Sequence, residues 1–534
     1  MNGTPRDEMA PSRLRTRFHQ AAWSEPLVMG LGRPGRRGVI PPGAPGPLGA
    51  ALPAAMDRIP DKLRRAAPPD LPELSQPEVV RHFTRLSQMV LAGNVSVSLG
   101  LGTTTMKYNP IVHELLTRSP KLAEVHPAQA DETIQGVLEI IHRLGGYLQA
   151  ISGMDRFSLQ PGGGSQGIFS NALAMKAYHA ARGDTARDEI ITTIFSHPAN
   201  GAAPATAGFK VITLYPGPRG IPDVSALKAA VSERTAGLFI TNPEDTGIFN
   251  PHVDEFVKVI HDAGGLCVYD QANANGILGI TRARDAGFDM CHFNLHKTFS
   301  VPHGCMGGAV GAVGVSEELA PFLPTPSVEY DQGRYFVRTT GEASIGTLRA
   351  WYGNVHSIVK AYAWITTMGA DGLRAAAEAA VLNNNYLVER VKAIRGASVS
   401  FGDSNDDRRL DQARYSWEQL TADTGITTSQ IHDRVIDFGV QSYFTSHHPW
   451  LVPEPFSLEP AESYSLEDLD EYAGVLEQIS SEAYDDPEVI RTAPHRSTTA
   501  PIKASSYARP FMTWQAYEDR ARIEPPASDV PSRT

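Results

Sequence analysis

The sequence predicts an α/β fold in which a large, mostly parallel sheet carries helices on its faces. Short apolar runs typical of buried strands recur between residues 189 and 293, and amphipathic helical stretches separate them. This alternation indicates a parallel sheet, because neighbouring parallel strands need a crossover between them. A glycine-rich turn precedes the region, and a turn with one lysine ends it. Ligands of such sheets bind at the carboxyl ends of the strands.

The composition limits the classes of protein to which the chain can belong. It has 534 residues, of which 42% are hydrophobic and 20% charged, with a net charge of −11 and a pI near 5.9. This acidic balance argues against a general nucleic-acid binder, which needs a basic face. No apolar run of about 18 residues predicts a membrane span. The three cysteines cannot form a disulfide framework, which favours a cytoplasmic location.

The first residues, up to about 55, are expected to form an extended arm. They carry several arginines without hydrophobic periodicity, and residues 35–53 are rich in Pro, Gly and Ala. Acidic residues near the start and the lack of an apolar stretch argue against a signal or transit peptide. We predict an arm at 1–75, a large domain at 76–330, a smaller α+β domain at 331–515 and a tail at 516–534.

A glycine-rich turn at residues 161–167 opens onto a predicted helix that begins at Ile168. Free N–H groups and the positive end of the helix dipole bind anions at such a position. Gly164, Ser165 and Gln166 are therefore candidates to hold a phosphate group. Glycine turns before helices are also common as simple chain reversals, so the motif taken alone leaves that alternative open.

Lys297 lies in a polar turn directly after the strand-like run that ends at Phe293. The apolar neighbours predict that this lysine is buried. Burial lowers the pKa of a lysine, because the ammonium loses its hydration, and the neutral amine is a nucleophile towards aldehydes. The position therefore favours Schiff-base chemistry.

Asp270 ends the preceding strand-like run, so it is expected to face the same crevice as Lys297. An aspartate opposite a pyridine nitrogen keeps that nitrogen protonated, and together with the lysine it indicates pyridoxal phosphate. His197 follows a third strand, where its ring could stack on a planar cofactor. The alternatives are that Asp270 only caps its turn and that Lys297 and His197 are ordinary loop residues.

The chain after residue 330 predicts a smaller α+β domain that closes over the first. Long helices are expected at 348–367 and 371–394, short strands at 398–401 and 415–420, and a helix at 465–482 opened by a capping box of Ser465 and Asp468. A loop in this domain contains the adjacent pair His447 and His448. No further cluster of His, Cys or carboxylate residues with ligand spacing accompanies them, so we predict no metal site.

Several motifs along the chain carry a resemblance to a known family. They are Asn294–Ser300 followed by Pro302-His303-Gly304, and further runs at 319–324, 77–89, 105–110, 270–273, 381–387 and 493–495. Together they resemble the C-terminal (β) half of the P-protein of the glycine cleavage system, the pyridoxal-phosphate glycine decarboxylase. The resemblance covers about residues 25 to 515.

The resemblance implies a fold-type I pyridoxal-phosphate transferase with an aspartate aminotransferase-like fold. In it Lys297 carries the cofactor, Asp270 pairs with the pyridine nitrogen and His197 stacks on the ring. The implied reaction decarboxylates glycine, a small amino acid, and transfers the aminomethyl group to the lipoyl arm of H-protein, with an α (N-terminal-half) subunit as a second partner. Further implied cofactor contacts are Ala272, Asn242, Asn294 and His296, and implied substrate contacts are Thr103, Thr105, Lys107, His303 and His448.

The chain departs from the family pattern around this core, for example at Gln271, Met306 and Val310. Side chains in place of glycines occupy volume or restrict the backbone where substrate approaches. Two other functions therefore stay open beside glycine decarboxylation. One is a pyridoxal-phosphate enzyme for another amino acid, and the other is a non-catalytic assembly subunit, which the presence of both Lys297 and Asp270 disfavours.

Overall fold

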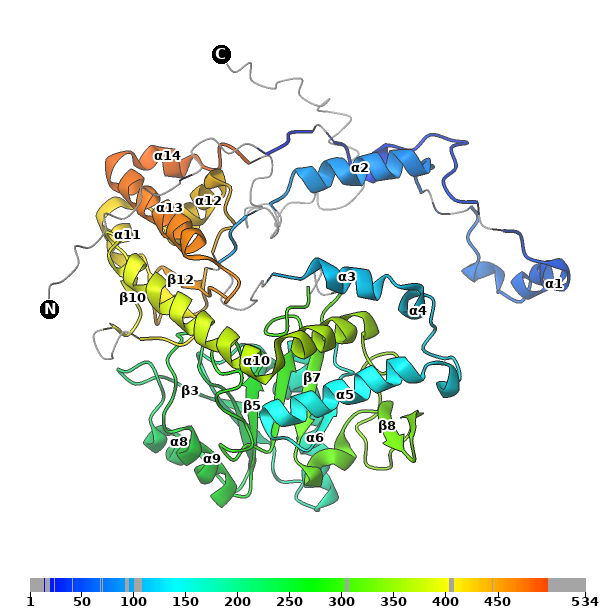
Figure 1. Ribbon diagram of the computed structural model, residues 1–534, viewed down its shortest axis with the longest axis horizontal. Coiled ribbons are helices and arrows are strands. Elements are labelled where there is room, and N and C mark those ends of the chain that lie inside the picture. Colours follow the sequence, from blue (N-terminus) through cyan, green and yellow to red (C-terminus); the bar gives the residue numbers. More distant parts are fainter. Residues whose placement is uncertain are drawn as a thin grey trace, which may run out of the picture. The chain divides into compact units, whose positions relative to one another are not determined.

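The computed structural model describes residues 14, 20–23, 25–40, 42–67, 69, 71–91, 96–99, 108–302, 307–402, 408–443 and 445–497 (Figure 1). The chain divides into two compact units. One comprises Met1–Arg17 with Ala92–Ala493, and the other comprises Phe18–Leu91 with Pro494–Thr534. Among the helices that the structure describes, none combines the length and apolar character that a membrane crossing requires.

A seven-stranded sheet forms the centre of the first unit, with the strand order β1-β7-β6-β5-β4-β2-β3. The four pairings from β3 to β6 are parallel, whereas β7 pairs antiparallel with both β6 and β1. The mostly parallel sheet predicted from the sequence is therefore confirmed. The strands are β1 (Arg156–Ser158), β2 (Glu189–Thr193), β3 (Lys210–Leu214), β4 (Thr235–Thr241), β5 (Leu266–Gln271), β6 (Met290–Asn294) and β7 (Gly311–Val315).

Two helices, α6 (Gly164–Ala181) and α7 (Ala199–Thr206), cover one face of the sheet. Their apolar side chains pack with strand residues that point to this side, such as Ile190, Phe239 and Val268. Burial of these side chains removes apolar surface from water, which is the main force that holds helix and sheet together. The packing fixes the N-terminus of α6 against the carboxyl ends of β6 and its neighbours.

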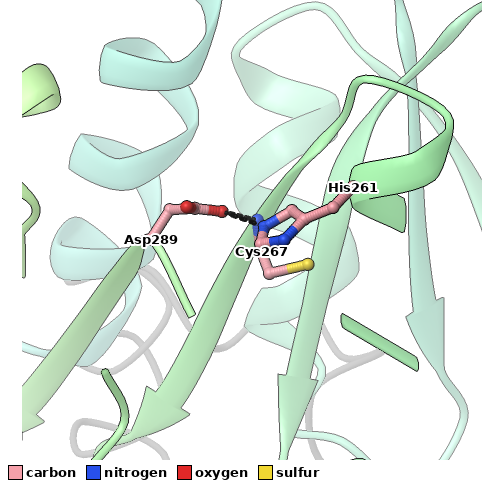
Figure 2. A group of neighbouring side chains, drawn as sticks. All are labelled: His261, Cys267 and Asp289. Atoms are coloured by element: carbon pink, nitrogen blue, oxygen red, sulfur yellow. Dashed lines mark hydrogen bonds and ion pairs between the residues drawn. The ribbon is translucent and has the colours of Figure 1, made fainter. Parts of the chain in front are cut away.

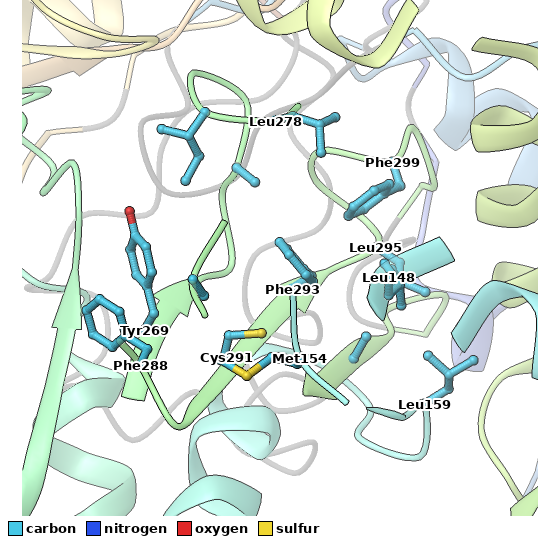
Figure 3. Close-up of a cluster of buried hydrophobic side chains, with 14 of the residues drawn as sticks. Leu148, Met154, Leu159, Tyr269, Leu278, Phe288, Cys291, Phe293, Leu295 and Phe299 are labelled. Carbon is cyan, nitrogen blue, oxygen red and sulfur yellow. The ribbon is translucent and has the colours of Figure 1, made fainter. Parts of the chain in front are cut away.

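The opposite face of the sheet is covered by α5, α8, α9 and the first part of α10. Figure 3 shows part of this core, with Tyr269 and Phe293 from the central strands and Leu148 from α5. Side chains alternate between the two faces of a strand, and helices cover both faces of this sheet. Both sides of β5 and β6 are therefore buried, which explains their continuous apolar sequences. The helices are α5 (Gln135–Ser152), α8 (Val224–Ala230), α9 (Val253–Asp262) and α10 (Val355–Lys392).

Helix α10 connects the core of the large sheet with a second core in the C-terminal part of the unit. Its first part contributes Ile358 and Trp364 to the sheet core, and its second part contributes Leu387 and Val391 to the other. Gly369 interrupts it with a non-helical conformation (φ 63°, ψ −179°). The two predicted helices are thus the two parts of α10, and the first begins at Val355 instead of residue 348.

The C-terminal part of the first unit contains a three-stranded antiparallel sheet with helices packed on it. The capping box at the start of α13 is confirmed, because Ser465 Oγ accepts from the backbone N–H of Asp468 at 3.2 Å and the Asp468 carboxylate accepts from the N–H of Ser465 at 3.0 Å. The elements are β10 (Ser398–Val399), β11 (Ala413–Ser416), α11 (Glu418–Thr424), α12 (Thr428–Val435), β12 (Pro455–Leu458), α13 (Leu466–Asp485) and α14 (Pro487–Arg491).

The strand predicted at residues 415–420 is wrong beyond Ser416, where the chain turns into α11. Ser416 Oγ accepts the backbone N–H of Glu418 at 3.1 Å and begins the helical turn. Trp417 and Leu420 are both fully buried, and a spacing of three fits a helix as well as an apolar run. Elements without a sequence prediction include β7, the hairpin β8 (Ser327–Asp331) and β9 (Arg334–Arg338), and the short helices α3 (Ile111–Thr117) and α4 (Pro120–Ala123).

The described residues of the second unit form two α-helices, α1 (Gly46–Met56) and α2 (Gln76–Gln88). Helix α2 carries a capping box of Ser75 and Glu78. The expectation of extended chain is wrong for α1, although Pro53 lies inside it. The alanines of α1 favour helix. Pro47, in the first turn, costs no hydrogen bond because the N–H groups there have no partner within the helix.

Candidate active site

A pocket of about 360 Å³ lies at the carboxyl ends of β5 and β6, beside the N-terminus of α6. Pockets that bind small molecules usually range from about 300 to 1,000 Å³, so this one suits a cofactor with a small substrate. It lies where the parallel part of the sheet meets antiparallel β7. Its lining residues are Gly162, Gly163, Gly164, Ser165, Gln166, Ile168, His197, Asp270, Ala272, His292, Asn294, His296 and Lys297.

Lys297 lies in the turn that follows β6, where its backbone N–H donates to the carbonyl of Asn294 at 3.0 Å. Only 7% of its surface is exposed. Burial lowers the pKa of its amine, and the negative charges of Glu459 and Asp270 oppose that shift only in part. The amine therefore loses its proton more readily than an exposed lysine and can act as a nucleophile in the pocket.

Asp270 is 2% exposed and is surrounded by partners for its carboxylate. It accepts from Asn200 Nδ2 at 2.7 Å, from Thr241 Oγ1 at 3.3 Å and from the backbone N–H of Ala272 at 3.0 Å. His292 Nε2 lies 3.2 Å from Oδ1, the oxygen that accepts from Ala272. Burial alone would raise the pKa of this carboxyl, but the imidazoles nearby and the hydrogen bonds lower it on balance. The group stays ionised and can hold a positive charge opposite it.

His197 follows β2 and presents its ring to the pocket. Its Nδ1 accepts from the backbone N–H of Ala199 at 3.1 Å, which requires that this nitrogen carry no proton. The surrounding protein removes part of the hydration of the imidazolium, and this desolvation together with the charge of Lys297 lowers the pKa of the imidazole to about 4. The ring is therefore neutral at physiological pH, as a stacking partner for an aromatic cofactor should be. That His197 stacks on such a ring stays a prediction.

The predicted phosphate-binding residues form the first turn of α6, which begins at Gly164 and not at Ile168. The side chain of Gln166 stabilises this earlier start. Its Oε1 accepts from the backbone N–H of Gly162 at 2.5 Å, and its Nε2 donates to the carbonyl of Leu348 at 2.9 Å. The first N–H groups of the helix consequently open into the pocket, where they can bind an anion.

Arg349 is a cation near this turn that sequence reasoning missed. Its Nη1 lies 2.8 Å from the place where a Cβ on Gly162 would stand, so a side chain at this position would displace the guanidinium. The same nitrogen donates to the carbonyl of Ala309 at 3.4 Å. A guanidinium beside a helix N-terminus favours a phosphate at this place. No spacing pattern connects it with the glycine turn.

A substitution at Gly164 should test this anion site. A Cβ at this position would lie 2.8 Å from Asn294 Nδ2, and Asn294 is buried, so Gly164→Ala must displace the Asn294 amide into the pocket. Overpacking of this kind costs about 1–3 kcal/mol, so we expect the affinity for pyridoxal phosphate to fall by about fivefold to 150-fold. Titration of cofactor-free protein measures the affinity.

The matched control for this variant is Gly145→Ala, which adds the same methyl group inside α5 with no atom within 4 Å of it. We expect Gly145→Ala to bind the cofactor as tightly as the unaltered chain does. Equal affinities of both variants and the unaltered chain would contradict an anion site at the start of α6.

The structure brings most of the remaining predicted cofactor residues to the pocket, but not Asn242. Its side-chain amide pairs with the backbone of Asn250, accepting at 2.8 Å and donating at 3.2 Å. His448 also lies away from the pocket lining, with its ring centroid 6.3 Å from that of Phe195. Of these remaining predicted cofactor residues, the ones that line the pocket are Ala272, Asn294 and His296. Thr103, Thr105, Lys107 and His303 lie outside the described residues.

Two carboxylates from the C-terminal part of the unit also act on this pocket, and the sequence did not indicate them. Asn273, in the loop after β5, donates to Asp411 at 2.9 Å and to Glu459 at 2.5 Å. Both carboxylates are buried, and both oppose the lowering of the pKa of Lys297. The smaller sheet therefore contributes to the charge balance around the lysine. Their distance along the chain from Asn273 explains why no motif revealed them.

The fold and the site define a class of protein, the fold-type I pyridoxal-phosphate transferases. Residues 165–410 match the family model of class-V aminotransferases, and residues 376–503 match that of the C-terminal domain of glycine dehydrogenase. A "Probable glycine dehydrogenase (decarboxylating) subunit 2" of Pyrococcus abyssi is 43% identical over 512 residues, which cover 94% of this chain and 98% of the relative. The chain belongs to the glycine dehydrogenase (decarboxylating) subunit 2 family.

Other relatives carry the same name. That of Caldanaerobacter subterraneus is 40% identical over 492 residues, which cover 91% of this chain and 98% of the relative. Among solved structures, a glycine decarboxylase (P-protein) of the glycine cleavage system covers 80% of this chain and 95% of its own, with a TM-score of 0.65 and 18% identity. The cysteine desulfurase CsdA of Escherichia coli covers 74% and 97%, with a TM-score of 0.54 and 15% identity. These structures confirm the predicted fold.

Proposed function

We propose that this chain is the cofactor-bearing subunit of a glycine dehydrogenase (decarboxylating). The observation that carries the proposal is that one pocket contains both a buried lysine, Lys297, and a buried, ionised aspartate, Asp270. Identity of 43% over nearly the whole length to relatives named for this activity supports glycine as the substrate. A non-catalytic subunit would have no need for these two buried charges, which are costly without a function.

The residues of the pocket fit pyridoxal phosphate. Lys297 offers an amine to the aldehyde, Asp270 offers a carboxylate to the pyridine nitrogen, and the first turn of α6 with Arg349 offers N–H groups to the phosphate. The buried Oδ1 of Asn294 has no hydrogen-bond partner among the described residues, as expected of a group that waits for a ligand. When bound, this cofactor supplies an electron sink for the pair of electrons left after decarboxylation.

The protein's own groups then have distinct tasks. Asp270 keeps a negative charge fixed in a dry environment, where it stabilises positive charge more strongly than it could in water. Lys297 would hold the cofactor through its amine, which burial makes easier to deprotonate. His197, neutral because of its lowered pKa, can cover a ring without adding charge. Water has little access to Asp270 and Lys297, because both are buried.

We further infer that the enzyme works in the cytoplasm with two protein partners. The relatives are named "subunit 2", which supports a first, α subunit as one partner. A lipoylated H-protein is the proposed acceptor of the aminomethyl group, and a lipoyl disulfide needs an open route to the pocket. Cys267 and Cys291 are free and buried, which suits a reducing compartment.

Reconstitution should show that turnover is selective for glycine. We expect glycine–bicarbonate exchange only when this chain, the α subunit and lipoylated H-protein are combined. A pocket of about 360 Å³ that also holds the cofactor leaves little space for a side chain. Each added methylene in a tight pocket costs about 1–3 kcal/mol, so binding should weaken stepwise from glycine to alanine and larger amino acids. Cofactor absorbance during amino-acid titration measures this binding.

The control for the acceptor is H-protein without its lipoyl group, which should not support exchange. Tight binding of a bulkier amino acid together with no glycine exchange, even with both partners present, would overturn the glycine assignment. It would instead favour a pyridoxal-phosphate enzyme for another amino acid, and the cofactor assignment would still stand.

A further inference from the structure

A second cluster of reactive side chains lies in the same sheet, at the opposite end of its strands. Cys267 is near the amino end of β5, and Asp289 directly precedes the amino end of β6, whereas the active-site pocket is at the carboxyl ends of these strands. His261, near the end of α9, completes the cluster. Figure 2 shows the imidazole between the carboxylate and the thiol. None of these three residues takes part in the proposed decarboxylation.

The ligand atoms of the three side chains lie close together. The Nδ1 or Nε2 of His261, the Sγ of Cys267 and a carboxylate oxygen of Asp289 are all within 4.8 Å of one another. His261 Nε2 is 2.8 Å from Asp289 Oδ2, and the same oxygen accepts from the backbone N–H of Cys267 at 2.8 Å. The thiol itself donates to a backbone carbonyl, that of Val257, at 3.9 Å.

Backbone geometry holds the cluster in place. Helix α9 ends in a tight turn in which Gly264 (φ +80°) donates to the carbonyl of His261 at 2.8 Å, and Gly265 donates to that of Ile260 at 3.0 Å. Strand β5 begins immediately after this turn. The backbone N–H of Asp289 donates to the carbonyl of Cys267 at 3.0 Å and sets the start of β6 beside it. Three separate elements therefore converge on one point, as structural metal sites require.

The donor set suits a transition-metal ion. Imidazole nitrogen, thiolate sulfur and carboxylate oxygen are the three ligand types that Zn²⁺ uses, with water in a fourth position when three protein ligands are present. Bond lengths of about 2.0–2.3 Å in a tetrahedral site place its donor atoms about 3.3–3.6 Å apart. The observed separations, 2.8 Å for one pair and up to 4.8 Å for the set, bracket this value, so side-chain rotation alone can reach it.

Burial and charge around the cluster also fit an ion. Cys267 is fully buried, and burial together with the charge of Asp289 raises the pKa of its thiol, so an ion would have to displace the proton. His261 is the exposed member, with 39% of its side chain accessible, and provides the route from solvent. Arg284 Nη1 lies 3.6 Å from Oδ1 of Asp289, which leaves Oδ2 as the ligand oxygen.

We propose that His261, Cys267 and Asp289 form a zinc site that joins α9 to the amino ends of β5 and β6. On binding, the thiol releases its proton to solvent, and so does the ring of His261 when it starts as imidazolium, whereas a neutral ring binds through its unprotonated nitrogen and releases none. The His261–Asp289 hydrogen bond is replaced by two metal–ligand bonds, and no oxidation or reduction occurs. The sequence predicted no metal site. This proposal differs from that prediction, because only the folded sheet brings the three residues together. It lies beyond the proposed function and does not depend on it.

The test uses the untagged full-length holoenzyme after chelator treatment. We titrate Co²⁺ and follow the visible d–d absorption of a tetrahedral thiolate site, at longer wavelength than the cofactor absorbs, and then displace the Co²⁺ with Zn²⁺. We expect about one equivalent to bind with a Kd below about 10 µM, weaker than structural sites with four protein ligands. Cys267→Ser and His261→Ala should each weaken binding at least about tenfold, because each removes a ligand.

The matched control is His252→Ala. His252 lies at the other end of α9 and contacts one carboxylate, Glu255, at 2.8 Å, with no thiol. This variant should bind Co²⁺ as the unaltered chain does. Zn²⁺ should also raise the Tm of the unaltered chain and of His252→Ala but not that of His261→Ala, since a ligand that binds only the folded state stabilises it.

Circular dichroism checks that the variants fold, and His261→Ala is the safer one because its side chain is exposed. The absence of stoichiometric binding to the unaltered chain would overturn the proposal. So would a Co²⁺ spectrum and affinity that Cys267→Ser and His261→Ala leave unchanged. Glycine–bicarbonate exchange measured in parallel reports on the active site separately, so either proposal can fail without the other.

Discussion

We expect Lys297→Ala to abolish covalent attachment of the cofactor and to lower glycine–bicarbonate exchange by at least about a thousandfold, because it removes the amine that would bind the aldehyde. Lys297 is the one lysine that lines the described part of the pocket. Alanine cannot form the bond to the cofactor, because it has no amine. Exchange assays on the reconstituted system measure the loss.

Borohydride reduction followed by peptide mapping gives an independent measurement of the attachment point. The pyridoxyl group should appear on the peptide that contains Lys297 in the unaltered chain and on no peptide of the variant. The control is Lys176→Ala, since Lys176 lies on α6 and donates to the carbonyl of Ala207 at 2.7 Å, outside the pocket. Attachment to another lysine in the unaltered chain would refute the role of Lys297.

The pH at which this amine reacts is a further consequence of its burial. In cofactor-free protein, the rate of attachment should rise with pH as the ammonium loses its proton. Because burial lowers the pKa of Lys297, that rise should come at lower pH than for a lysine in water. The acidic groups Asp411 and Glu459 limit the shift, so neutralising either of them should move the rise to still lower pH.

The sequence alone could predict the central residues of the site because they follow directly from strand ends. Apolar runs marked β5 and β6, and in a parallel sheet the residues after neighbouring strands must meet. Asp270 and Lys297 were therefore placed in one pocket by local pattern alone. The function was harder to predict, because the same two residues suit many pyridoxal-phosphate enzymes, and the structural likenesses at 18% identity or less concern only the fold.

The residues that sequence reasoning missed are those brought in from distant parts of the chain. Arg349 reaches the glycine turn, and Asp411 and Glu459 reach the loop after β5, without any spacing that connects them. The cluster of His261, Cys267 and Asp289 is hidden for the same reason. Strand β7 was missed because glycine and alanine, which are common in it, are poor strand signals, although both neighbours of this strand fix its register.

Asp270→Asn should retain the fold and some cofactor but lose about a thousandfold in exchange activity. The amide keeps the size of the side chain and can still accept a hydrogen bond, but it carries no charge. A buried carboxylate stabilises a protonated pyridine nitrogen strongly, because no water screens the interaction. Without that charge the ring is a weaker electron sink, so the carbanion left by decarboxylation forms more slowly.

A second variant, Asn200→Ala, separates the charge of Asp270 from its orientation. Asn200 donates to the Asp270 carboxylate at 2.7 Å, so its removal costs one hydrogen bond to a charged group and leaves the charge in place. Such a bond contributes about 1.5–3 kcal/mol, and the hydrogen bonds from Thr241 and Ala272 remain, so we expect a loss of about tenfold to a hundredfold. Exchange rates and cofactor affinity of both variants should be measured together, with circular dichroism as the check on folding. Near-normal turnover of Asp270→Asn, or equal losses in the two variants, would show that the carboxylate positions the ring without serving as its counter-charge.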